Sequence, residues 1–345
     1  MLILRPVAAE DLDDLLELAS QLDSVNLPRD RDFLAERIAL SQRSFAAVRG
    51  DLRVDWRECA YVFVMEDREA GRCVGSSLIL AKTGRPEAPY YWLEVSSEER
   101  WSPDLRKRFV HKKLRLRSTV DGPTEVGGLI LEPSYRAHPQ KCGKALSSVR
   151  FAFVSAHPER FERQLIAEML SPFDAQGRHL LLEAFGARFT GLAYREADHL
   201  SARTKQFIAD LFPEDPVYVT LFPEEVQKSI GEPAESAKAA VRILERIGFQ
   251  PLNQVDPFDG GPYVGAAREA IASVRDRRRL VLPGVVQERE IPAQPKLALL
   301  AAEGRLGFRS TVVPLDAVGA PLVSKATREA LGVSAGDQVS VTPLP

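Results

Sequence analysis

The segment "HPQKCGKALSS" (residues 138–148) decides how the middle of the chain folds, because it joins an apolar run to an amphipathic pattern. The run before it, residues 124–131, is the most apolar strand candidate and predicts a central strand. The apolar spacing after it predicts a helix over residues 144–156. A strand that passes into a helix through Gln-x-x-Gly-x-Ala has two explanations, which are simple turn chemistry and a bound phosphate.

The predicted helix start has the properties of an anion site. A helix N-terminus presents unpaired N–H groups and the positive end of the macrodipole, so it binds a phosphate without a charged side chain. Small residues are needed where the ligand touches the backbone, and Gly143 and Ala145 meet that need. The predicted cofactor-binding residues of this loop are Gln140, Lys141, Cys142, Gly143, Lys144 and Ala145.

Composition limits the class of protein. The 345 residues are 45% hydrophobic and 27% charged, and the formal net charge of −2 argues against a general nucleic-acid binder. Three cysteines without metal-type spacing fit a reducing compartment, and we expect neither disulfides nor a metal. Neither a signal peptide nor an apolar run of the roughly 20 residues that span a bilayer is evident. We therefore expect a cytoplasmic protein without membrane contact.

The patterns on either side of the central strand predict a mixed fold. Before it, we expect a strand at 2–5, a helix at 10–19, a helix after Pro28, a hairpin of 60–65 with 73–80, and strands 90–95 and 111–118 around a charged loop. After it, residues 164–194 and 216–255 both read as strand, helix, glycine and strand, with Gly186 and Gly248 as helix caps. This similarity is either a partial internal duplication or the coincidence of a common α/β pattern.

The last 60 residues differ in composition from the rest of the chain. A linker-like segment rich in proline and charge starts near residue 284, and strands around one short helix follow it. Ser324 and Gly332 are the predicted caps of that helix. This tail is similar to the swapped-hairpin barrels of bacterial transition-state regulators. Without a basic face, it is expected to be a structural or dimerisation element.

The order of these features resembles the GNAT superfamily of N-acyltransferases, whose corresponding loop cradles the pyrophosphate of coenzyme A. Within it, "EVGGLILEPSYR", "RFERQLIAEM" and "FDGGP" resemble, in order and spacing, the arginine N-succinyltransferases, including the arginine/ornithine-specific subunits. The resemblance implies an α/β (α+β) fold with a mixed, mostly antiparallel sheet, flanking helices, a partial second half and a small β-rich C-terminal region. The expected divisions are 1–198, an acyl-CoA-binding domain; 199–283, a half that completes the acceptor site; and 284–345.

The implied reaction is succinyl transfer from succinyl-CoA to the α-amine of arginine, the first step of an arginine catabolic route. The strand amide expected to polarise the thioester falls on Leu129, with Ile130 and Leu131 alongside. Glu125 stands where several GNAT enzymes keep a carboxylate base, and it is equally explained as a solvated strand-end residue. Asp256 and Asp259 are expected to bind the guanidinium or amine, or else to cap a Pro/Gly-rich turn.

Two departures from the family pattern leave alternatives open. Ala234 stands where the family has its proton-donating histidine; Glu232 or Glu235 could replace it, or could simply be helix-start acids. The basic run 106–117 is either a solvated strand face or a wall that would repel arginine. The alternatives are therefore an acyltransferase with another amine, such as ornithine, or another acyl-CoA, and a weakened CoA-binding subunit that supports an active partner. A homo- or hetero-oligomer is expected.

Overall fold

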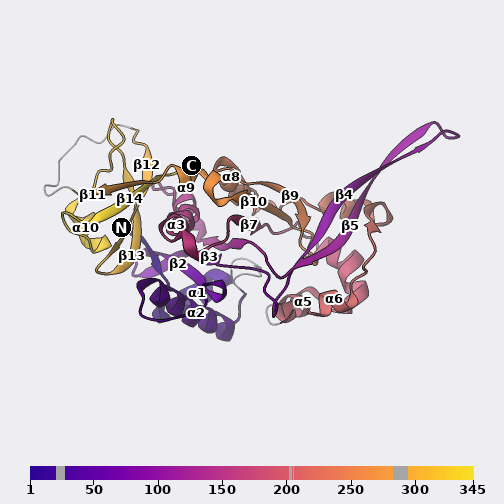
Figure 1. Ribbon diagram of the computed structural model, residues 1–345, viewed down its shortest axis with the longest axis horizontal. Helices are drawn as coiled ribbons and strands as arrows, with labels where there is room; N and C mark the ends of the chain where they lie inside the picture. Colours follow the sequence, from indigo (N-terminus) through magenta and orange to yellow (C-terminus); the bar gives the residue numbers. More distant parts are fainter. Residues whose placement is uncertain (21–27, 202–203, 205, 283–293) are drawn as a thin grey trace.

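The computed structural model describes residues 1–20, 28–201, 204, 206–282 and 294–345. In these residues one twisted sheet of fourteen strands runs through the molecule in the order β11-β14-β12-β13-β1-β2-β3-β6-β7-β10-β9-β4-β5-β8 (Figure 1). Apart from β6 with β7, the described neighbours are antiparallel. The expected class, a mixed fold with a mostly antiparallel sheet and flanking helices, is confirmed.

The strands are β1 (Leu2–Pro6), β2 (Ala60–Asp67), β3 (Arg72–Leu80), β4 (Tyr90–Ser102), β5 (Lys107–Thr119), β6 (Thr124–Leu131), β7 (Gln164–Glu168), β8 (Val217–Tyr218), β9 (Gln250–Val255), β10 (Pro262–Ala267), β11 (Arg278–Val281), β12 (Leu297–Gly304), β13 (Gly307–Pro314) and β14 (Gln338–Pro343). The helices are α1 (Leu12–Ala19), α2 (Arg31–Arg49), α3 (Cys142–Ala156), α4 (Ala187–Thr190), α5 (Tyr194–Ser201), α6 (Gln206–Leu211), α7 (Glu224–Ser229), α8 (Lys238–Arg246), α9 (Ala272–Arg275) and α10 (Lys325–Leu331). The predicted hairpin of β2 with β3 is confirmed.

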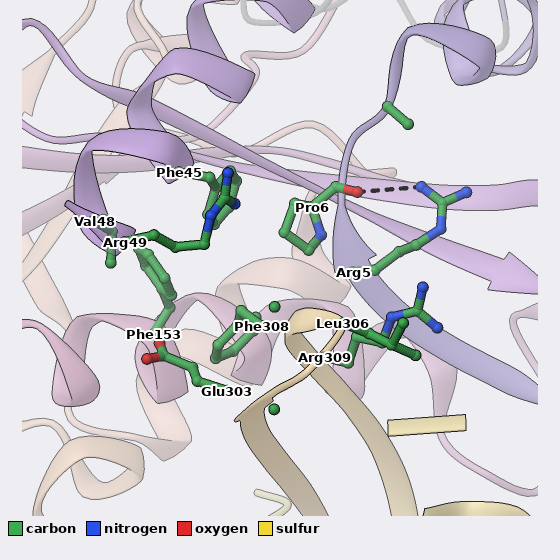
Figure 2. A pocket seen from close by; sticks show the side chains of 13 residues that line it. Arg5, Pro6, Phe45, Val48, Arg49, Phe153, Glu303, Leu306, Phe308 and Arg309 are labelled. Atoms are coloured by element: carbon green, nitrogen blue, oxygen red, sulfur yellow. Dashed lines mark hydrogen bonds between the residues drawn. The ribbon is translucent and has the colours of Figure 1, made fainter. Parts of the chain in front are cut away.

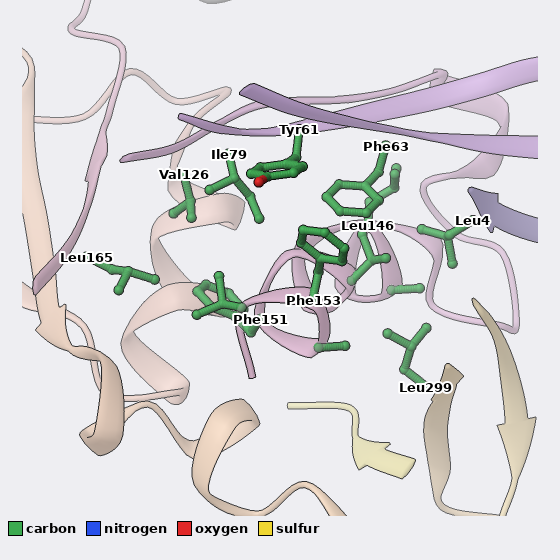
Figure 3. Close-up of a cluster of buried hydrophobic side chains, with 14 of the residues drawn as sticks. Leu4, Tyr61, Phe63, Ile79, Val126, Leu146, Phe151, Phe153, Leu165 and Leu299 are labelled. Carbon is green, nitrogen blue, oxygen red and sulfur yellow. The ribbon is translucent and has the colours of Figure 1, made fainter. Parts of the chain in front are cut away.

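The central strands are buried on both faces. Alternate side chains of β2 point to opposite sides, so Tyr61 and Phe63 pack beneath α3, while Val62 and Val64 pack against α1 and α2. Phe153 of α3 lies at the middle of the first cluster and meets Phe63 edge-on, with ring centroids 5.4 Å apart (Figure 3). Each such buried side chain contributes about 1.5–3 kcal/mol, so α3 is fixed firmly against the sheet.

Strands β6 and β7 pair only where they begin. Their parallel register is Thr124 with Leu165 and Glu125 with Ile166, and neither strand continues the ladder beyond it. On its other edge, β6 carries an extra residue, because Gly127 pairs with Leu78 and Ile130 with Ser76. Gly128 makes this bulge with a φ of +57°. The second half of β6 therefore runs beside β3 alone and turns a free edge toward β7.

The second half of the sheet has its own core, and here parts of the secondary-structure prediction are wrong. Residues 182–190 form a continuous helical segment in which Gly186 is helical, and Gly191 ends it with a φ of +69°. The helix α4 (Ala187–Thr190) lies where a strand was expected after Gly186, and the predicted strand 216–222 shortens to Val217–Tyr218. Apolar side chains of these helices pack on Leu93 and Leu114, so burial against β4 and β5 decided their conformation.

The charged loop expected between residues 95 and 111 is strand. β4 and β5 form one long hairpin, paired from Tyr90 with Thr119 to Ser102 with Lys107, that projects from the body (Figure 1). Ion pairs cross it, including Lys113 with Glu98 at 2.8 Å. Because opposite charges face each other across the strands, the basic run 106–117 is a solvated hairpin face.

The tail continues the sheet at the opposite side. Ser324 accepts a hydrogen bond from the Thr327 amide and Gly332 ends α10, so both predicted caps are confirmed. β13 pairs with β1, and β14 pairs with β11, which belongs to the preceding segment. Most of the predicted linker, residues 283–293, lies outside the described residues. The three-part division of the chain stays a prediction.

The bulge on β6 leads to a test of packing. A Cβ added to Gly128 would lie 2.9 Å from Cβ of Leu78, whereas one added to Gly177, also at positive φ, meets nothing within 4 Å. We expect Gly177→Ala to lower the free energy of unfolding by about 1 kcal/mol and Gly128→Ala by about 2–3 kcal/mol. Urea unfolding of both variants measures the difference. Equal losses would contradict the close approach of β3 to the bulge.

Candidate functional site

The N-terminus of α3 has no cap of its own. Lys141 precedes the helix in the left-handed region, with φ 55° and ψ 50°, and its side chain makes no capping hydrogen bond. The first amide to find a helical acceptor is that of Ala145, which donates to Lys141 at 3.0 Å. Among the described residues, the amides of Gly143 and Lys144 meet no acceptor. This helix start can therefore accept an anion.

Cations surround this helix start. Lys141 is exposed, and Lys144 is half-buried with its Nζ on the oxygen of Pro345. The pKa of Lys144 is lowered by burial and then by the positive charges of Arg246 and Lys141. Three neighbouring positive charges repel one another, and a bound polyanion such as a diphosphate would relieve that repulsion.

The side chains of the loop separate into two groups. Cys142 and Ala145 are fully buried in the main core, so only their backbone can meet a ligand. Burial raises the pKa of the Cys142 thiol to about 11, which keeps it protonated and unsuited to nucleophilic attack. Gly143 has open space around it, since an added Cβ would meet only Leu131, at 3.8 Å. The backbone amide of Gln140 donates a hydrogen bond to Nδ1 of His138, and this bond fixes the loop.

The free edge of β6 connects this helix start to Glu125. Leu129 and Leu131 are half-buried and pack on the main core, whereas Ile130 is buried against α1 and α2. The backbone of residues 127–131 therefore borders the opening between β6 and β7. Glu125 lies at the closed end of this opening, where the two strands still pair.

A cluster of carboxylates lies at the far end of β7. Glu168 ends β7, Asp256 follows β9, and Asp259 sits in the next turn; their oxygens all lie within 4.8 Å of one another. The Tyr263 hydroxyl donates to Glu168 at 2.9 Å. Three carboxylates this close favour a cation between them. The structure thus brings Asp256 and Asp259 together, as predicted, and adds Glu168.

Two tyrosines connect this cluster with Glu125. The rings of Tyr90 and Tyr263 meet edge-on, with centroids 5.6 Å apart. Their pKa values are both raised, first by burial and then by the charges of Glu125 and Glu168. Both hydroxyls therefore stay protonated and can donate hydrogen bonds. The base predicted on β6 and the acids predicted near residue 258 face one buried pair of rings.

The two predicted aspartates have different surroundings. Asp256 is half-buried and caps the turn by accepting from the amides of Phe258 and Asp259. Asp259 is buried, accepts from the amides of Ser171 and Gly261, and lies 3.8 Å from Nδ1 of His179. Burial, followed by the charge of Asp256, raises the pKa of Asp259 to about 7. Asp256 is thus the one that a ligand can reach.

Ala234, predicted from the resemblance to stand at the family's histidine position, lies near this cluster. Its amide donates to the carbonyl of Leu170 at 2.7 Å, and Gly231 donates to Gly260, next to Asp259. The two glutamates that could replace the histidine differ from Ala234 in exposure. Glu232 is exposed, and Glu235 is exposed and paired with Lys238 at 2.6 Å. Lys238 lowers the pKa of Glu235, so this carboxyl is a poor proton donor at neutral pH.

Sequence reasoning missed Glu168, Tyr90, Tyr263 and His179. Glu168 carried a usable signal, because it is an acid directly after the apolar residues 165–167. The others carried none: Tyr90 and Tyr263 fit ordinary strands, and His179 fits the start of a predicted helix. Only the pairing of β10 with both β7 and β9 brings these distant residues together.

A separate cavity of about 520 Å³ lies between α2, β1 and the turn from β12 to β13 (Figure 2). Phe45, Phe153 and Phe308 line it. Its three arginines already have partners: Arg5 pairs with Asp11 and Glu66, Arg49 pairs with Asp51, and Arg309 donates to the carbonyl of Ala330. The predicted site residues do not line this cavity.

Comparison with known proteins identifies the family. A family model described as the arginine N-succinyltransferase beta subunit matches residues 2–273. The chain belongs to the arginine N-succinyltransferase family. The resemblance read from the sequence is thereby confirmed, together with membership among N-acyltransferases that use CoA thioesters.

Relatives of this family match over the whole chain. An arginine N-succinyltransferase of Yersinia pseudotuberculosis is 34% identical over 351 residues, covering 100% of this chain and 98% of that protein. The arginine N-succinyltransferase subunit alpha of Pseudomonas aeruginosa is 35% identical over 353 residues, covering all of both. The structure of arginine/ornithine succinyltransferase subunit AI from P. aeruginosa has a TM-score of 0.84 and 30% identity, covering 100% of this chain and 99% of that one. The fold is therefore shared from end to end.

Two further findings concern the chain as a whole. In the part of the chain that the structure describes, no helix has the length and apolar character needed to cross a membrane. Cys59, Cys73 and Cys142 are all buried and free.

The raised pKa of Asp259 predicts a pH-dependent contribution to stability. Its folded pKa of about 7 lies above the ordinary value of 3.8, so folding favours the protonated form. That stabilisation is present below pH 4 and is lost as the pH rises toward 7. We expect Asp259→Asn to reduce the free energy of unfolding by about 2 kcal/mol more at pH 5 than at pH 8. Urea unfolding at both pH values checks this; a reduction that grows with pH would contradict it.

Proposed function

We propose that the protein transfers the succinyl group of succinyl-CoA to the α-amine of arginine in the cytoplasm. The observation that carries the proposal is the opening between β6 and β7, which has an uncapped, cation-rich helix start beyond the end of β6 and a carboxylate cluster at the end of β7. The anionic substrate would thus bind on the β6 side of the opening and the cationic substrate on the β7 side. The family's name and the names of its relatives supply the succinyl and arginine specificity.

The CoA end uses backbone contacts. The diphosphate would bind the amides of residues 140–145, with Lys141 and Lys144 beside it. The pantetheine arm would lie along the free edge of β6, next to Leu129, Ile130 and Leu131. Hydrogen bonds from the strand would then polarise the thioester carbonyl as negative charge develops on its oxygen. Succinyl-CoA is in this view the acyl donor, and the chemistry needs no metal.

The acceptor end uses charge. Asp256 and Glu168 would hold the guanidinium, which suits paired carboxylates because its N–H groups form a planar fork. Asp259, which is buried and hydrogen-bonded to two amides, would hold the turn in place. An arginine held this way points its α-amine toward Glu125, the proposed base.

Glu125 would act on the amine, which must lose a proton before it can attack. Its side chain is buried at the end of the opening and faces the two protonated tyrosines. Attack on the thioester carbon forms the new C–N bond, and collapse of the intermediate breaks the C–S bond and releases the CoA thiolate. Glu232 and Glu235 are the less favoured proton donors for that thiolate, because both are exposed.

One observation supports a second candidate function. Ala234 occupies the position of the family's proton donor, beside the carboxylate cluster, and alanine carries no exchangeable proton. A subunit that binds CoA and supports a histidine-bearing partner would keep the helix start and lose turnover. The hairpin β4–β5, with exposed Trp101 and Phe109, offers such a partner an apolar surface.

The decisive experiment follows thiol release from succinyl-CoA with arginine, ornithine or lysine as acceptor. We expect release with arginine, and we expect Asp256→Asn to raise the KM for arginine by about 10-fold or more without weakening CoA binding, because the guanidinium loses a half-buried charge partner. Asp276→Asn, in an exposed ion pair with Arg275, is the control and should change neither value. CoA binding without thiol release from any amine, followed by turnover in Ala234→His, would favour the supporting subunit.

The CoA loop is tested by filling the space at Gly143. An added side chain has room within the fold, so Gly143→Val should keep the melting temperature within a few degrees of the wild-type value. It should raise the Kd for CoA about 10-fold or more, because the valine would occupy the space of the phosphate. Calorimetric titration with CoA measures this, and Gly143→Ala should give an intermediate value. Unchanged affinity in the valine variant would place the diphosphate elsewhere.

A further inference from the structure

A buried arginine lies beneath the opening between β6 and β7. Arg150 of α3 is only 2% exposed, yet among the described residues no carboxylate lies within ion-pair distance of it. Its hydrogen bonds go to the carbonyl of Ser147 at 3.2 Å, the hydroxyl of Ser147 at 2.8 Å and the carbonyl of Gly127 at 3.4 Å. These bonds occupy three of the five N–H groups of a guanidinium.

An unpaired buried cation destabilises the protein unless it has another use. Removing a guanidinium from water has a large desolvation penalty, and neutral oxygens recover only part of it. Burial lowers the pKa of Arg150 to about 9, and no neighbouring charge opposes that shift. At neutral pH the side chain is still charged. Arg37, whose pKa burial also lowers, differs because the charge of Glu125 opposes that lowering.

The position of Arg150 identifies what would balance its charge. Its Nη1 contacts Gly127 on β6, one residue before the bulge and two before Leu129, where the thioester is proposed to bind. Two residues of strand span about 7 Å. A succinyl group carries its free carboxylate about 4 Å from the thioester carbon, so this carboxylate comes within reach of the guanidinium.

We propose that Arg150 binds the free carboxylate of the succinyl group and so selects a dicarboxylic acyl-CoA over a neutral one. This inference rests on the proposed function, whose acyl donor it explains. Without substrate, the guanidinium of Arg150 lies under β6 with two N–H groups that make no hydrogen bond to any residue the structure describes. The succinyl carboxylate then supplies the anion that pairs with it. Arg150 then forms a charge-assisted, bidentate pair with the carboxylate. A neutral acyl chain would leave the guanidinium buried and unpaired, which weakens its binding.

The test compares succinyl-CoA with butyryl-CoA, which has an acyl chain of the same carbon number without the carboxylate. We expect the wild-type protein to bind succinyl-CoA about 10- to 100-fold more tightly, and Arg150→Met to abolish that preference. Arg277→Met is the matched control, because Arg277 also donates to a carbonyl and a hydroxyl of one α3 serine, Ser155, far along the helix. It should keep the preference. Calorimetric titration gives each Kd.

The melting temperature of Arg150 variants distinguishes a role in acyl-CoA selectivity from a purely structural role. Because the apo cation has no carboxylate partner, Arg150→Met should leave the melting temperature of the apo protein unchanged or higher. Arg150→Lys should keep part of the preference and Arg150→Gln should lose it, and this pair decides the matter if the methionine variant does not fold. Preference retained without the guanidinium, or equal weakening of both thioesters, would overturn the proposal. Preferential succinyl-CoA binding without transfer to any amine would overturn the proposed function alone.

Discussion

The parting of β6 from β7 is the constraint on which the rest of the structure depends. Two parallel strands that share only Thr124–Leu165 and Glu125–Ile166 leave a wedge of unpaired backbone inside a sheet that is otherwise antiparallel. The bulge at Gly128 bends β6 away, and α3, fixed by its buried phenylalanines, starts just beyond the wide end of the wedge. Backbone hydrogen-bonding groups that a continuous sheet would have paired are left without a partner strand here.

Charged side chains are arranged around the same wedge between β6 and β7. Lysines gather beyond the end of β6, carboxylates gather at the end of β7, and the guanidinium of Arg150 lies underneath. Each group is unfavourable by itself, because like charges repel and buried ions lose hydration. The two hydrophobic cores fix the groups in place, one under α3 and one under the helices that follow β7. The stability of the two cores thus offsets the cost of holding these charges in place.

The first half of the fold could be predicted from the sequence because its signals are local. The β2–β3 hairpin, α3 and the capped helix α10 follow from periodicity, turn residues and caps. The helices between β7 and α7 could not, since packing on β4 and β5 overrode their strand-like pattern. Of the site, Asp256, Asp259 and the loop before α3 were recognised from motifs, whereas Tyr90 and Glu168 become neighbours only through strand order.

The pairing of β1 with β13 has a consequence for biosynthesis. β1 leaves the ribosome about 300 residues before β13, and one of its edges stays open until residues 307–314 arrive. At about 5–20 residues per second, that wait lasts some 15–60 seconds. Throughout it, an apolar strand edge is available for wrong partners. Translation speed and chaperone access around the nascent chain would therefore influence how much active protein a cell obtains.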